Sequence, residues 1–102
     1  MPAIQFSIPH SLDTDEAVTR LKGFVGKLRE RNEPKFMVKS EQWEQRKLSC
    51  AFSSYGFAMD ATMQVEPHEV KFHLQIPFAA IVFKGQIEQR LRDELTKVLS
   101  SG

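Results

Sequence analysis

The chain has 102 residues, of which 41% are hydrophobic and 26% charged, and its 14 basic and 13 acidic residues leave a net charge of +1. This length predicts one domain, residues 1–102, with a single hydrophobic core. The balanced charge argues against a nucleic-acid-binding protein, because phosphate neutralisation requires a basic surface. A single cysteine excludes a disulfide framework, and no apolar segment is long enough to span a bilayer. We therefore expect a cytoplasmic protein without an integral membrane segment.

The chain begins with apolar and polar residues in alternation over residues 4–8, which predicts a half-buried strand that ends at Pro9. A helix is expected over about 13–32. Its start is marked by Asp13 and Glu16, which are spaced like a capping box. Its apolar residues recur at helical spacing and form one stripe, which consists of Ala17, Val18, Leu21, Phe24, Val25 and Leu28.

Two glycines, Gly23 and Gly26, lie inside this predicted helix. Each weakens a helix by roughly 1 kcal/mol relative to alanine, so we expect them to permit close packing on a sheet. Basic residues outnumber acidic ones over residues 20–39. Cations near the C-terminal end of a helix suit its dipole, which favours a solvated helix end over the alternative of an anion-binding patch.

Residues 36–76 follow a period of two and predict four further strands, joined by short turns at 45–46, 55–56 and 66–69. The first of these strands, Phe36 to Trp43, has apolar residues of both parities, which predicts a bulge or an edge position. With these turns, apolar residues face apolar residues on one side of the sheet. The predicted pairs are Trp43 with Leu48, Leu48 with Met63, Cys50 with Ala61, Phe52 with Met59, Met63 with Phe72, and Val65 with Val70.

A second helix is predicted to begin near Lys84 or Gly85. Its core-facing residues would be Ile87, Leu91, Leu95, Val98 and Leu99. The order strand, helix, four-strand meander, helix predicts an α+β fold, with both helices packed on one face of an antiparallel sheet. The pattern leaves the position of the first strand in the sheet open.

Polar candidates for chemistry are few. His73 and Asp60 would share the outer sheet face and form a conceivable acid-base dyad, but no nucleophile accompanies them, so a chance surface pair is favoured. His10 precedes the first helix, and a local hydrogen-bonding role is favoured over contact with a ligand. Cys50 points toward the core, which favours an inert thiol over a nucleophile. Neither metal-ligand spacing nor a glycine-rich phosphate loop is found, so no metal or cofactor is expected.

An uncharged apolar run, Ile76 to Phe83, connects the last strand to the last helix. The run is too short for a membrane span, and Pro77 should end the strand. Burial between the sheet and the helix is the favoured interpretation. The alternative is an exposed apolar docking patch for a lipid-like or polyester surface, or for another subunit. Its members would be Phe78, Ile81, Val82, Phe83 and Lys84.

Three segments carry a family resemblance: IPHSLDTDEAVTRLKGFVGKL near the start, WEQRKLSCAF in the middle and FKGQIEQRLRDELTKVL at the end. Together they resemble the polyhydroxyalkanoic acid system protein family of small bacterial proteins. The matching positions are hydrophobic and turn residues, and none is a catalytic signature. The family often has proline after the glycine of its FKG motif, where this chain has Gln86. The resemblance implies a role connected to an intracellular storage polyester.

We therefore predict a non-enzymatic accessory protein of a polyhydroxyalkanoate storage system, which binds the granule surface or a granule-associated protein. Two alternatives stay open. One is a homo-oligomerising structural or regulatory module. The other is a small enzyme that acts on a hydroxyacyl substrate through His73 and Asp60, or through His10. No nucleic acid is expected as a partner.

Overall fold

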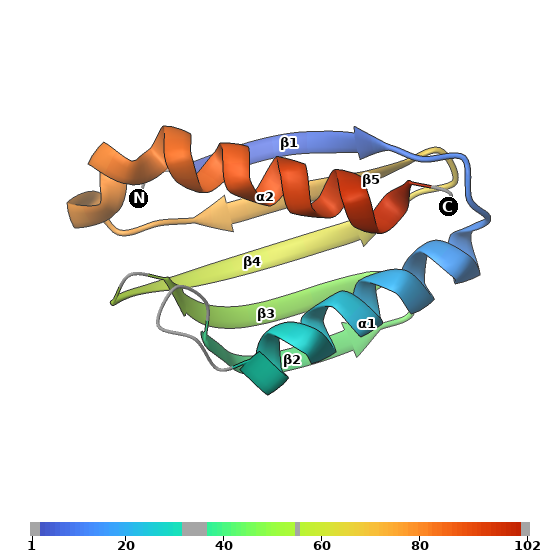
Figure 1. The fold of residues 1–102 in the computed structure, drawn as a ribbon, viewed down its shortest axis with the longest axis horizontal. Helices are drawn as coiled ribbons and strands as arrows, with labels where there is room; N and C mark the ends of the chain where they lie inside the picture. Colours follow the sequence, from blue (N-terminus) through green and yellow to red (C-terminus); the bar gives the residue numbers. More distant parts are fainter. Residues whose placement is uncertain (1–2, 32–36, 55, 101–102) are drawn as a thin grey trace.

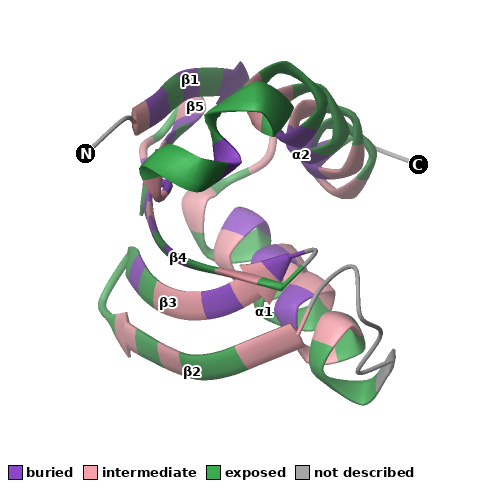
Figure 2. Cartoon of the chain, turned by 90° about the vertical axis from the view of Figure 1, so that its left-hand side faces the viewer, coloured by how far each residue is buried: buried purple, intermediate pink, exposed green. Residues whose placement is uncertain are grey.

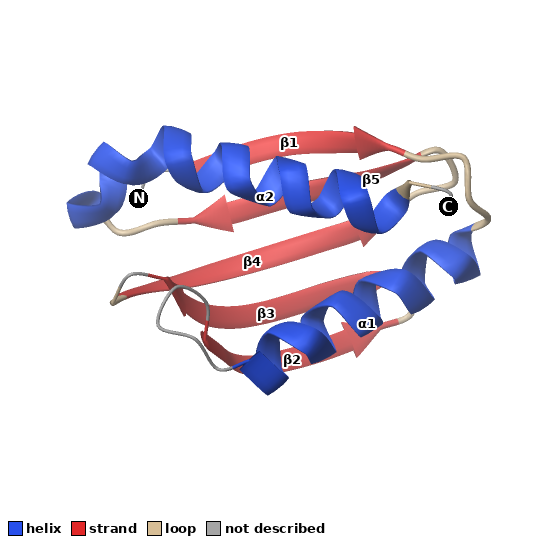
Figure 3. Cartoon of the chain, in the orientation of Figure 1, coloured by secondary structure: helices blue, strands red, loops and turns tan. Residues whose placement is uncertain are grey.

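The computed structural model describes residues 3–31, 37–54 and 56–100 of the chain. The elements follow the predicted order of strand, helix, four strands and helix (Figure 3). The expected helix end at Asn32, the strand start at Phe36 and the turn residue Tyr55 lie outside the described residues. The elements are β1 (Ala3–Pro9), α1 (Thr14–Arg31), β2 (Met37–Glu44), β3 (Lys47–Ser54), β4 (Phe57–Val65), β5 (Glu69–Gln75), the short 3₁₀ helix η1 (Phe78–Phe83) and α2 (Lys84–Leu99).

The five strands form one antiparallel sheet in the order β1-β5-β4-β3-β2. The meander from β2 to β5 is therefore extended by β1, which pairs with β5 and forms the edge opposite β2. The register of β2 shifts between Val38 and Ser40, which confirms the predicted bulge on an edge strand. Gln45 and Gly56 adopt positive φ angles of 56° and 83° in the two tight turns that flank β3.

The predicted register is confirmed throughout the meander. Because side chains alternate between the two faces of a strand, this register places one set of apolar residues under the helices and a polar set on the opposite face. The observed pairs include Trp43 with Leu48, Leu48 with Met63, Cys50 with Ala61, Phe52 with Met59, Met63 with Phe72, and Val65 with Val70.

Both helices cover the same face of the sheet, as predicted: α2 lies in front of β1 and β5, and α1 in front of β2 and β3 (Figure 1). The core lies between these two layers. It includes the fully buried Leu21 of α1, Leu48 and Leu74 of the sheet, and Leu95 of α2. Of the described helices, none is long and apolar enough to cross a membrane.

The start of α1 is capped as predicted, because the Asp13 Oδ1 accepts a hydrogen bond from the Glu16 N–H at 3.0 Å. The predicted reason for the helix glycines is wrong. A Cβ atom built on Gly23 or Gly26 would meet no atom within 4 Å, so neither residue permits a close approach to the sheet. The apolar stripe faces the sheet instead, and the two glycines lie on the other side of the helix, where Gly23 is exposed and Gly26 half-buried.

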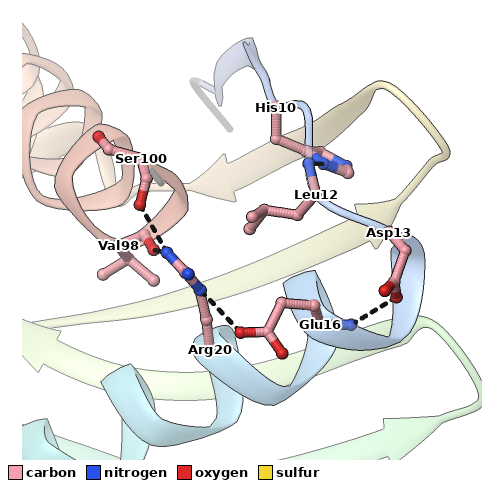
Figure 4. Close-up of polar contacts among 7 residues, drawn as sticks. All are labelled: His10, Leu12, Asp13, Glu16, Arg20, Val98 and Ser100. Atoms are coloured by element: carbon pink, nitrogen blue, oxygen red, sulfur yellow. Dashed lines mark hydrogen bonds and ion pairs between the residues drawn. The ribbon is translucent and has the colours of Figure 1, made fainter. Parts of the chain in front are cut away.

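Arg20 joins the first half of α1 to the end of α2 (Figure 4). Its Nε donates to Glu16 Oε1 at 3.0 Å, and its Nη1 donates to the carbonyl oxygens of Val98 and Ser100. These carbonyl groups lie at the C-terminal end of α2, where they lack intrahelical partners. The two helices are therefore held together at this end, and they diverge toward the other end of the sheet (Figure 1).

Candidate functional site: an apolar patch on a short helix

The chain leaves the sheet at Pro77 and forms η1 before it enters α2. Pro77 has no N–H for the strand ladder, and its carbonyl oxygen accepts a hydrogen bond from the Ala80 N–H at 3.0 Å, which begins the 3₁₀ turn. A 3₁₀ helix repeats every three residues, so Ala80 and Phe83 share one side. Ala80 is fully buried and anchors this side on the core. The other two sides of η1 must therefore face solvent.

The favoured prediction of burial for this run is confirmed for Ile76 and wrong for the large side chains of η1. Phe78 is 71% exposed, Ile81 49%, Val82 78% and Phe83 36%, and Phe83, on the side of Ala80, is the least exposed. Figure 2 views this end of the molecule and shows η1 largely exposed, with one buried position. We call these four residues, together with Lys84 at the start of α2, the apolar patch.

Phe57 extends the apolar patch from a different part of the chain. Its ring centroid lies 6.0 Å from that of Phe83, and its side chain is only partly buried. Phe57 is the first residue of β4, and this strand begins at the end of the sheet where η1 lies (Figure 1). Its strand parity assigned it to the core face. Because Phe57 directly follows a hairpin turn, at the end of the sheet that the helices no longer cover, its side chain could have been expected to be partly exposed.

The predicted pair of His73 and Asp60 lies on the outer sheet face, and Thr62 is directly opposite His73 as expected. Asp60 is opposite Gln75, two pairs further along the sheet, so it is diagonal to His73 as predicted, and no hydrogen bond joins the two candidate residues within the described part of the chain. A shallow hollow on this face is lined by His73 but not by Asp60. The two groups therefore share the outer face as diagonal neighbours but do not line a common hollow.

His10 has the local role that the sequence favoured. Its Nδ1 accepts a hydrogen bond from the Leu12 N–H at 3.2 Å, and its Nε2 lies 2.8 Å from the Glu66 carbonyl oxygen. A carbonyl oxygen only accepts, so Nε2 is the donor in this hydrogen bond. Figure 4 shows the ring next to Leu12. Both nitrogens of this buried side chain are thus occupied in fixing the segment between β1 and α1.

Cys50 is partly buried on the helix-covered side of the sheet. Burial, with a smaller contribution from the Glu41 carboxylate, raises the pKa of its thiol to about 11. Because the thiolate is the nucleophile, this environment suppresses its reactivity. Within residues 3–31, 37–54 and 56–100, no group of three or more His, Cys, Asp or Glu side chains is arranged to hold a metal ion.

The family model described as "Putative polyhydroxyalkanoic acid system protein" matches residues 4–99 of the chain. The match extends from the second residue of β1 to the last residue of α2 and includes the whole of η1. Comparison with curated proteins and with solved structures gives no significant match.

Proposed function

Because this chain belongs to the polyhydroxyalkanoic acid system protein family, we propose that it is a non-enzymatic accessory protein that binds the polyester surface of a storage granule through the apolar patch. The observation that supports this proposal is the exposure of four large apolar side chains on η1. The largest contiguous apolar patch on a soluble protein is often functional, which makes this cluster a candidate interaction site.

The apolar patch is large enough to drive adsorption on an apolar surface. With side chains between 36% and 78% exposed, the four residues present roughly 400 Å² of apolar area. Complete transfer of this area from water contributes at most ~10 kcal/mol before the losses of association are subtracted. A standard interface buries about 800 Å² on each partner, of which roughly 60% is apolar, so the apolar area of the patch alone does not separate a polyester surface from a second copy of the chain.

The patch is also preformed. Ala80 and Ile76 are both fully buried, so η1 is attached to the core on either side of Pro77. A rigid patch loses little conformational entropy on binding, which leaves more of the transfer free energy for affinity. Lys84 is the charged member of the patch and starts α2 directly after Phe83, and its long side chain allows the ammonium group to stay in water while the apolar residues contact the polyester.

Co-sedimentation with polyhydroxybutyrate particles tests the proposal. We expect the natural protein to pellet with the particles, and Phe78→Asp/Val82→Asp to stay in the supernatant, because two carboxylates at the contact must be desolvated. The matched control is Ser11→Asp/Thr19→Asp, which changes the charge equally at exposed positions of the opposite end of the molecule and should pellet normally.

Equal pelleting of all three proteins would overturn the assignment to the patch. Light scattering across a concentration series tests the alternative that the patch is the interface of a homo-oligomer. If the natural protein forms a dimer that Phe78→Asp/Val82→Asp converts to a monomer, and particle binding is absent, the patch is a subunit interface and the granule proposal is wrong.

A further inference from the structure

A groove runs between α1 and α2 on the outer side of the helix layer, and its volume is about 420 Å³. It exists because the helices converge only where Arg20 binds the end of α2, and diverge from there (Figure 1). The absence of a side chain at Gly23 keeps the α1 wall open, since no atom occupies the 4 Å around a Cβ position there. The groove is lined by Arg20, Gly23, Phe24, Lys27, Leu28, Glu94 and Val98.

The groove adjoins a smaller cavity between the helices and the sheet. Phe24 and Leu28 line both spaces, so only their side chains separate the groove from the interior. The inner cavity has a volume of about 40 Å³, and its lining is entirely apolar, with contributions from α1, α2 and four strands. A space of this size holds little more than a methyl group. The apolar part of a ligand in the groove would therefore contact Phe24 and Leu28, where the groove meets the core.

The rim of the groove carries more positive than negative charge. Arg20 and Lys27 line it on α1, and Glu94 lines it on α2. Arg20 is already paired with Glu16 and with carbonyl groups, so its charge is fixed in place. Lys27 is exposed and takes part in no ion pair within the described part of the chain. Its ammonium group is thus available to an anion next to partly exposed apolar side chains.

We propose that this groove binds a single-chain amphiphile with a carboxylate headgroup, such as a medium-chain alkanoate. The acyl chain lies against Phe24, Leu28 and Val98, and the headgroup pairs with Lys27. The combination of an apolar floor with a few charged groups at the rim is typical of small-molecule sites. The proposal does not rest on granule binding, because the groove residues lie on α1 and on the second half of α2, whereas the apolar patch precedes α2.

Sodium decanoate, used below its micelle concentration, is the probe. Calorimetry together with NMR of the leucine and valine methyl groups should show saturable binding at one site, with shifts at Leu28 and Val98. Gly23→Met should weaken the affinity at least about tenfold, because the new side chain fills the groove. Gly26→Met is the matched control: it makes the same change on the same helix, but Gly26 lines neither space, so its affinity should be unchanged.

Both methionine variants should remain folded, since methionine is a better helix former than glycine and its Cβ atom meets no atom outside the helix's own backbone at either position. Lys27→Gln should weaken binding of decanoate and leave binding of 1-decanol unchanged. The proposal is overturned by a lack of saturable decanoate binding, by equal affinities of the two methionine variants, or by an equal effect of Lys27→Gln on acid and alcohol.

The two proposals fail separately in these experiments. Phe78→Asp/Val82→Asp should keep its affinity for decanoate, and Gly23→Met should still pellet with polyester particles. Loss of both activities in either variant would contradict the assignment of separate sites.

Discussion

Replacement of Gly23 and Gly26 by alanine is the most direct test of how α1 packs. In the helix interior, each glycine lowers stability by about 1 kcal/mol relative to alanine, because it loses more backbone entropy on folding. A Cβ atom at either position meets no atom within 4 Å, so no steric term opposes this gain. We expect the double variant to be more stable by about 1–2 kcal/mol.

Urea unfolding followed by the circular dichroism of the helices measures this change. The midpoint should rise without a change in slope, and the Tm should increase by roughly 5–10 °C for a chain of this size. Thr19→Ala, at an exposed position of the same helix, is the control for a general effect of alanine and should shift the Tm by a smaller amount.

A loss of stability in Gly23→Ala/Gly26→Ala would refute the reasoning. It would mean that the glycines permit a close approach of α1 to the sheet after all, as the sequence suggested, and that the distance between helix and sheet is shorter than the structure shows. The single variants would then identify the contact, because only the glycine at the close approach should destabilise.

Three further predictions concern buried polar groups. Burial raises the pKa of the Cys50 thiol from its ordinary value of 9.0 to about 11, which lowers its thiolate fraction at pH 8 roughly 100-fold. The thiol should therefore react with Ellman's reagent roughly 100-fold more slowly in the folded protein than in the urea-unfolded chain. A similar rate in both states would contradict this burial. Because this pKa is higher in the folded state, the contribution of the protonated thiol to the free energy of unfolding is complete below about pH 9 and is lost as the pH rises through 11. Cys50→Ala should therefore lose less stability than the natural protein when the pH is raised from 9 to above 11. Ser54 Oγ is buried without a hydrogen-bond partner among the described residues, so Ser54→Ala should raise the free energy of unfolding by about 1 kcal/mol, whereas a decrease would reveal a partner. His10→Ala removes both hydrogen bonds of the ring and should lower the free energy of unfolding by about 1–3 kcal/mol in urea titrations; a change below about 0.5 kcal/mol would show that the ring does not fix this segment.

The register of the sheet was predictable from the sequence. Each strand of the meander alternates apolar and polar residues, and a shift by one residue would expose every apolar side chain of that strand. The short turns at 45–46 and 55–56 then allowed only one register of β3 in which its apolar residues face apolar residues of both β2 and β4, for example Leu48 with Met63. The helix faces were predictable for the same reason, since Leu21, Leu91 and Leu95 repeat with the helical period and are all buried.

The sequence by itself therefore determined the strands and the two long helices, their order, the register of the meander and the family. Only the tertiary structure decided where β1 pairs, because the contact between β1 and β5 is long-range and no local pattern specifies it. It also decided which side chains of Ile76 to Phe83 are buried and which are exposed. A continuous apolar run has no periodicity from which its buried side can be read, and here a three-residue repeat anchored at Ala80 turns most of the large side chains toward water. The groove at Gly23 depends on the angle between two helices, which the packing of side chains on the sheet sets and which neither helix encodes alone.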